Sequence, residues 1–160
     1  MTPTLRPAVH ADAEAAAAMH AACWREAYAP YADPARLAER LADTERWVSA
    51  WTRHLLEGPP RVLAEADGQL VGFAVAGPNR DEDRPTPHEL YAMYVRAAHW
   101  GTGLGQRLWE AVRPDGPCSL WVLEDNERAR RFYARNGFAP DGLRQHYNEL
   151  GAREMRMVRP

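Results

Sequence analysis

The chain has 160 residues, a length that fits one domain with a sizeable core, so we expect a single domain over residues 1–160. All 20 basic residues are arginine and the formal net charge is -2, so there is no basic footprint for nucleic acid and no lysine for a Schiff base. No apolar run approaches the ~20 residues that span a bilayer, and no signal-peptide pattern opens the chain, so we expect a cytoplasmic protein without membrane partners.

The first third of the chain predicts a strand followed by helices. A short strand over 4–8 leads to Asp12, which we expect to cap an alanine-rich helix that runs to about Tyr28. Asp33 and the proline after it form a second helix start, with proline at the first helical position. The apolar spacing that follows predicts one long helix or two shorter helices, ending near Gly58.

The middle of the chain predicts strands. Residues 61–65 and 69–76 flank Ala66-Asp67-Gly68, which is a β-hairpin turn signal. Residues 77–87 are polar and rich in proline, which is typical of a surface loop. An apolar run over 90–95 then predicts the central strand.

The last part of the chain alternates helices and strands. A glycine-rich turn and a helix follow the central strand. A strand over 118–123 precedes Asn126, which caps a helix that ends before Gly137, and two final strands cover 138–143 and 153–158. The order is strand, two helices, three strands, helix, strand, helix and two strands. It favours an α+β fold in which helices interrupt a mixed, mainly antiparallel sheet.

The turn after the central strand carries Gly101, Gly103 and Gly105 at alternate positions. Such a turn at a helix N-terminus can hold phosphate, because glycine tolerates positive φ and because free amides and the helix dipole point at the anion. The pattern is weak alone. No Gly-Lys-Ser/Thr is present, and the sixth position of the dinucleotide fingerprint is Gln106. An ordinary strand-to-helix turn is the alternative.

Two sequence blocks carry a resemblance to a known family. Residues 95–105 resemble the pyrophosphate-binding motif of the GNAT superfamily of acyl-CoA-dependent N-acetyltransferases, Arg/Gln-x-x-Gly-x-Gly/Ala. Residues 126–138 match that family's Asn-x-x-Ala-x-x-Phe-Tyr-x-x-x-Gly-Phe signature at every named position. The order of elements agrees over the whole chain. The resemblance implies a GNAT fold, acetyl-CoA as cosubstrate, and direct attack by a primary amine in a ternary complex.

The resemblance also implies which residues bind the cofactor. They come from the central strand, the glycine-rich loop and the second block: Met93, Val95, Trp100, Gly101, Thr102, Gly103, Leu104, Gly105, Gln106, Asn126 and Phe132. The strand residues would offer backbone amides to the pantetheine arm and to the oxyanion that develops. The sequence departs from the family at Trp100, where arginine or glutamine is usual. Arg96 and Arg107 either compensate for that charge or are solvated surface residues.

The candidate general acid is Tyr133. The departing thiolate needs a proton, and the resemblance places this hydroxyl near the thioester sulfur. Tyr133 lies seven residues after Asn126, two helical turns, so both side chains face the same way. The alternative is a tyrosine that fills the core beside Phe132.

The candidate general base is Glu89, since an ammonium group must lose a proton before it attacks. Strand alternation predicts that Glu89, Tyr91, Met93 and Val95 share one face. The offset is similar to that of the base in the histone-acetyltransferase branch of the family. The alternative is an exposed charge at the end of a strand, beside the acidic residues 81–83.

The acceptor is the least defined part of the prediction. Tyr28 and Tyr31 lie near the gap between the first helices, where members of the family shape the acceptor pocket, and they are candidate substrate-binding residues. Aromatic rings there would suit a cationic amine. His146 and Tyr147 are further candidates. The tryptophans of the N-terminal helices, Trp24, Trp47 and Trp51, fit an amphipathic core better.

The remaining expectations concern other functions and partners. A non-catalytic acyl-CoA-binding or sensing module is the alternative function, and Trp100 is the feature that favours it. Cys23 and Cys118 lie outside the two blocks and match no metal or redox spacing, so we expect reduced thiols, no acyl-enzyme and no metal. The resemblance leaves a homodimer open.

Overall fold

The computed structural model describes residues 2–160 of the chain. The strands are β1 (Thr4–Pro7), β2 (Val62–Ala66), β3 (Gln69–Pro78), β4 (His88–Val95), β5 (Cys118–Leu123), β6 (Ala139–Tyr147) and β7 (Ala152–Arg159). The helices are α1 (Ala13–Tyr28), α2 (Pro34–Ala42), α3 (Thr44–Glu57), α4 (Leu104–Val112) and α5 (Glu127–Arg135). Two 3-10 turns, η1 (His10–Asp12) and η2 (Ala97–His99), complete the chain.

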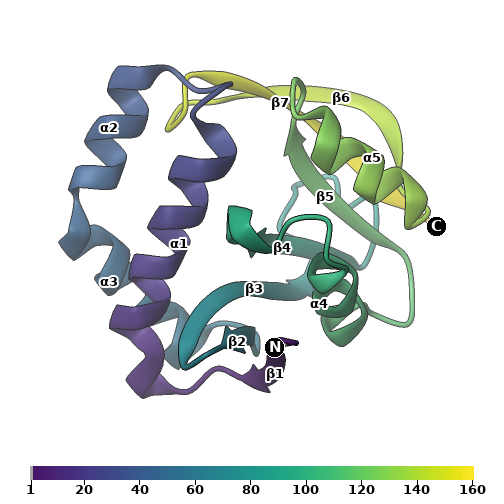
Figure 1. The fold of residues 1–160 in the computed structure, drawn as a ribbon. Coiled ribbons are helices and arrows are strands. Elements are labelled where there is room, and N and C mark those ends of the chain that lie inside the picture. The colour runs from purple at the N-terminus through teal and green to yellow at the C-terminus, as the bar shows by residue number, and fades with distance from the viewer. Residues whose placement is uncertain (1) are drawn as a thin grey trace.

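The seven strands form one sheet in the order β1-β2-β3-β4-β5-β7-β6, in which only the β4–β5 pair is parallel. The three N-terminal helices cover one face, and α4 and α5 cover the other (Figure 1). This confirms the α+β fold that the sequence predicts. Of the two arrangements left open for the second helical region, the structure has two helices.

The two faces are buried by alternating strand residues. Leu63 and Phe73 pack under α1 and α3, whereas Ala64 and Ala74, next to them in sequence, pack against α4. The tryptophans of the N-terminal helices are buried in the first of these cores, as expected for amphipathic helices: Trp24, Trp47 and Trp51. Within residues 2–160, no helix is both long and apolar enough to cross a bilayer.

Asp12 does not cap α1, contrary to our expectation. Its carboxylate accepts two hydrogen bonds from the Arg6 guanidinium, at 2.9 and 2.8 Å, and one from the Val9 amide at 2.8 Å. These bonds close η1, and α1 begins without a side-chain cap. By contrast, Asp33 accepts hydrogen bonds from the first amides of α2, as the sequence predicts.

The central strand β4 is irregular in two ways. A β-bulge at Tyr91 shifts its register against β3, so the predicted shared face of Glu89, Tyr91, Met93 and Val95 is wrong. Tyr91 packs toward the α1 side, while Met93 and Val95 pack toward α4. In addition, β4 pairs with β5 only through His88 and Glu89, after which the two strands diverge (Figure 1).

Candidate active site

A cavity of ≈ 970 Å³ occupies the space where β4 and β5 diverge. Its walls come from the end of α1, the β3–β4 loop, β4, the glycine-rich loop, β5, α5 and the β6–β7 hairpin. Over residues 2–160, β4 has no strand pair with β5 beyond Glu89, so the backbone groups on that edge of β4 face this space. The cavity is therefore large enough to hold a ligand along the open edge of β4.

The glycine-rich loop forms one end of the cavity. Gly101 and Gly103 have φ of 72° and 86°, a conformation that favours glycine, and both line the cavity together with Gly105 and Gln106. Inside residues 2–160, the backbone amides from Gly101 to Gln106 donate no hydrogen bond, and α4 starts without a side-chain cap. These amides are therefore free to bind an anion at the helix N-terminus.

Two of the predicted cofactor residues, Thr102 and Leu104, have side chains that lie outside the cavity lining, so they could contribute only backbone groups. The Leu104 side chain is buried in the core against the sheet. The Thr102 hydroxyl donates to the His99 carbonyl at 2.7 Å, and this side chain lies outside the cavity lining.

Trp100 has a local partner on each side. Its indole N–H donates to the Val95 carbonyl at 2.7 Å, and the Arg128 guanidinium lies 3.7 Å from its ring centroid. Arg128 comes from the first turn of α5 and lines the cavity. The arginines considered from the sequence are engaged elsewhere: Arg96 pairs with Glu26 at 2.9 Å, and Arg107 donates to the Pro3 carbonyl.

Tyr133, Phe132 and Asn126 line the same cavity from α5. Asn126 caps that helix by accepting from the Ala129 amide at 3.2 Å. The Tyr133 hydroxyl makes no hydrogen bond with the residues that the structure describes, and burial raises the pKa of Tyr133 to about 12. It is thus a protonated hydroxyl that faces the cavity and is free to donate.

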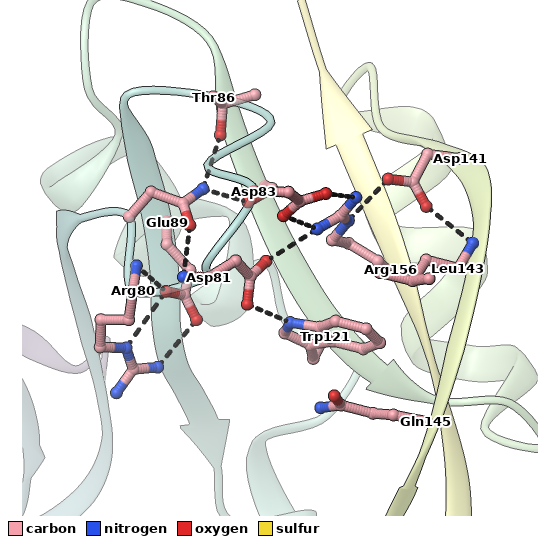
Figure 2. Close-up of polar contacts among 12 residues, drawn as sticks. Arg80, Asp81, Asp83, Thr86, Glu89, Trp121, Asp141, Leu143, Gln145 and Arg156 are labelled. Atoms are coloured by element: carbon pink, nitrogen blue, oxygen red, sulfur yellow. Dashed lines mark hydrogen bonds and ion pairs between the residues drawn. The ribbon is translucent and has the colours of Figure 1, made fainter.

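Glu89 is nearly fully buried at 3% exposure, and both of its oxygens are bound by Arg80. The guanidinium donates to them at 2.8 and 3.1 Å, and the Arg80 amide adds a third bond at 3.0 Å (Figure 2). The guanidinium also stacks on Tyr91, 3.7 Å from the ring centroid. Glu89 lines the cavity, but its charge is already balanced.

The β3–β4 loop is not only a surface loop, as its composition predicts, because ion pairs hold it against the sheet. Arg156 on β7, only 5% exposed, holds it through Asp81 and Asp83 and also binds Asp141 of β6 (Figure 2). The second oxygen of Asp81 accepts from the Trp121 indole at 3.0 Å. This network fixes the loop so that Arg80 and Asp81 form a wall of the cavity.

Three tyrosines line another part of the cavity. The hydroxyls of Tyr28 and Tyr94 lie 2.6 Å apart, and Tyr147 lines the same region. Burial raises the pKa of all three phenols, so they remain protonated. Tyr31 packs against the core of the N-terminal helices and does not belong to the cavity lining.

Several cavity residues were missed from the sequence: Arg80, Asp81, Tyr94, Trp121, Arg128, Gln145 and Glu154. None belongs to a local motif that names its role.

Comparisons with known sequences give a consistent result. The model of the acetyltransferase (GNAT) family matches residues 14–138. A probable N-acetyltransferase of Mycobacterium tuberculosis is 31% identical over 143 residues, which are 86% of this chain and 80% of that protein. The N-alpha-acetyltransferase RimI of the same species is 30% identical over 138 residues, 80% of this chain and 86% of that one.

Solved structures share the fold. A PaiA N-acetyltransferase from Thermoplasma acidophilum, in complex with coenzyme A, superposes with a TM-score of 0.69 at 17% identity, covering 99% of both chains. YncA from Salmonella typhimurium, solved with acetyl-CoA, gives a TM-score of 0.70 at 20% identity and covers 99% of this chain and 93% of its own.

Proposed function

This chain belongs to the GNAT acetyltransferase family, and from that premise we propose that a primary amine attacks acetyl-CoA directly, in a ternary complex held in the cavity between β4 and β5. The observation that carries the proposal is the divergence of these strands beside the free Tyr133 hydroxyl. N-acetyl transfer from acetyl-CoA is the activity of the family. We propose that this chain carries out the transfer within one domain, residues 1–160, and that the protein acts in the cytoplasm.

In this proposal the cofactor runs along the open edge of β4. The free amides of Gly101, Gly103 and Gly105 bind the pyrophosphate, and the backbones of Met93 and Val95 bind the pantetheine arm and the developing oxyanion. Arg128, stacked on Trp100, supplies the positive charge that the loop itself lacks. Phe132 and Asn126 complete the wall toward α5.

Arg128→Ala is expected to raise the Kd for CoA by about tenfold, because a guanidinium on a phosphate is a charge-assisted contact. The difference from the wild type should shrink at high salt. Binding is measured by isothermal titration calorimetry. The matched control is Arg131→Ala on the same helix, whose side chain is 73% exposed and pairs with Glu127. Pantetheine, which has no pyrophosphate, should bind the wild type and Arg128→Ala equally, and an equal Kd for CoA would contradict the role of Arg128.

The chemical step uses groups at the thioester. Tyr133 protonates the departing thiolate; because burial raises the pKa of Tyr133 to about 12, the phenol carries its proton at neutral pH. The role of Glu89 as the general base remains a prediction. One of its carboxylate oxygens would have to lose its hydrogen bond to Arg80 before it could accept a proton. Both cysteines are free and buried, and burial raises the pKa of each thiol, so neither is offered as a nucleophile.

The experiment for the function is thiol release from acetyl-CoA with a panel of polyamines, aminoglycosides, amino acids and peptides. Release that depends on one class of amine supports the proposal and names the acceptor. Binding of acetyl-CoA without release by any amine would favour the non-catalytic alternative. Failure to bind acetyl-CoA would overturn the cofactor site built on the glycine-rich loop.

A further inference from the structure

The carboxylates in the cavity differ in whether a cation already balances them. Asp81 pairs with Arg156 at 3.1 Å, and Glu89 pairs with Arg80 at 2.8 Å. Glu154 also lines the cavity, and no arginine or histidine within residues 2–160 pairs with it. Its hydrogen-bond partner is the neutral Gln145 amide. One negative charge in the cavity is thus left for a ligand to balance.

Glu154 lines the cavity from β7. It pairs in register with Leu123, the last residue of β5, just where β5 has separated from β4. Glu154, Tyr28 and Tyr133 all line the cavity. Tyr28, Tyr94, Tyr147 and Trp121 line the same cavity.

The surroundings of the Glu154 carboxylate also favour the binding of a cation. Burial raises the pKa of Glu154, and the negative charges of Asp81 on the β3–β4 loop and Glu89 on β4 add to this effect. The Gln145 amide on β6 acts in the opposite direction. The other titratable groups that face Glu154 are phenols of α1 and β6, Tyr28 and Tyr147.

We propose that Glu154 is the residue that binds the acceptor's ammonium group and takes its proton, and that the acceptor is a primary amine carried on an aromatic or apolar group. The inference rests on the proposed function for the transfer step, but the binding of the ammonium does not need turnover. The free charge selects a cation, and the surrounding rings favour a neighbouring apolar or aromatic moiety.

The proton balance of the step is complete with the groups present. Glu154 takes one proton from the ammonium and passes it to water. The neutral nitrogen forms the C–N bond at the thioester carbonyl carbon, and the C–S bond breaks. The nitrogen gives up a second proton to water, the sulfur receives one from Tyr133, and the Tyr133 phenolate takes a proton back from water. The products are the N-acetyl amide, CoA thiol and one released proton.

The first test measures binding without acetyl-CoA. We use 2-phenylethylamine as the cationic probe and 2-phenylethanol as its neutral match, and titrate each into the wild type, Glu154→Gln and Glu57→Gln. Glu57 is an exposed glutamate at the end of α3. The wild type and Glu57→Gln should prefer the amine, and Glu154→Gln should bind it about tenfold or more weakly, as expected for loss of a charged hydrogen bond.

The pH dependence of the same binding identifies the carboxylate. The probe stays cationic up to about pH 9, since alkyl ammonium groups titrate near pH 10. Binding to the wild type should therefore weaken as pH falls through the pKa of Glu154, and binding to Glu154→Gln should not show this loss. Equal affinity in the two proteins, or no preference for the amine over the alcohol, would overturn the inference.

Turnover separates this inference from the proposed function and from the alternative base. Thiol release by the wild type that Glu154→Gln leaves intact, while Glu89→Gln abolishes it, would overturn the role of Glu154 and keep the function. Release that Glu154→Gln lowers at pH 7 and regains at high pH, where the amine is already neutral, would support proton transfer to Glu154. Probe binding that needs Glu154 but never leads to release would contradict the proposed function and leave the ammonium site supported.

Discussion

Tyr133→Phe is expected to lower kcat by about 100-fold, because only the proton for the departing sulfur is removed. This decrease is at the lower end of the range for loss of a general acid, because a thiol titrates near pH 8.5 and a thiolate can leave without full protonation. Because burial raises the pKa of Tyr133 to about 12, the wild type should show no loss of rate from this group as pH rises toward 10. Thiol release at saturating acetyl-CoA and amine measures both effects.

The control for this variant removes a different hydroxyl from the same space. Tyr91 donates its hydroxyl proton to the Pro78 carbonyl, so it has no proton free for the thioester sulfur. Tyr91→Phe should therefore keep kcat near the wild-type value. Acetyl-CoA should bind Tyr133→Phe as tightly as the wild type, since ring packing against Phe132 and Phe138 is retained. A Tyr133→Phe enzyme with undiminished kcat would show that the thiolate leaves unprotonated or that another group serves.

The elements that local sequence determines were predicted well. Cys118–Leu123 has the boundaries that its apolar run predicts, and Asn126 caps α5 because the cap needs only an amide three residues away. Asp67-Gly68 turns the β2–β3 hairpin with φ of 50° and 74°, as that dipeptide requires. In each case the determining contact lies within a few residues of the signal.

The features that sequence reasoning missed depend on contacts between distant residues. Asp12 would cap α1 if Arg6 did not bind it, and the bulge at Tyr91 exists only in the register of β4 against β3. In the candidate site, the glycine-rich loop could be found from its motif, but the stacking of Arg128 on Trp100 and the free charge of Glu154 could not. Their roles depend on which other side chains are already paired, and no local pattern contains that information.

Arg156→Met is expected to lower the free energy of unfolding by about 2 to 3 kcal/mol, because it leaves three carboxylates without the cation that balances them. The guanidinium contacts Asp83 at 2.7 Å, Asp141 at 2.6 Å and Asp81 at 3.1 Å. This expected loss is smaller than that for breaking a fully buried ion pair, because Asp83 is more than half exposed and water can solvate it. Urea unfolding followed by circular dichroism measures the change.

The same substitution should also act on the active site. Without Arg156, the β3–β4 loop loses its tie to β7, and the Asp81 carboxylate keeps the Trp121 indole as its partner, so the wall that Asp81 forms is held less firmly. The expected result is a higher KM for the amine with a smaller change in the KM for acetyl-CoA, whose proposed pyrophosphate and pantetheine contacts come from the glycine-rich loop and β4. Arg153→Met is the matched control: it lies on the same strand, is 66% exposed and contacts Glu124 only at 3.7 Å, so it should cost less than about 0.5 kcal/mol.

The pH dependence decides whether the loss in Arg156→Met is electrostatic. Arg156 holds the pKa of Asp83 below its usual value, so this contribution is present above about pH 4, the range of a free aspartate, and is lost as pH falls through the lowered pKa of the folded state. The difference in free energy of unfolding between the wild type and Arg156→Met should therefore be largest at pH 7 and should decrease as pH falls below about 4. A gap that stays constant down to pH 3 would mean that Arg156 stabilises the β6–β7 hairpin by packing its aliphatic stem, and the loop would then need another anchor.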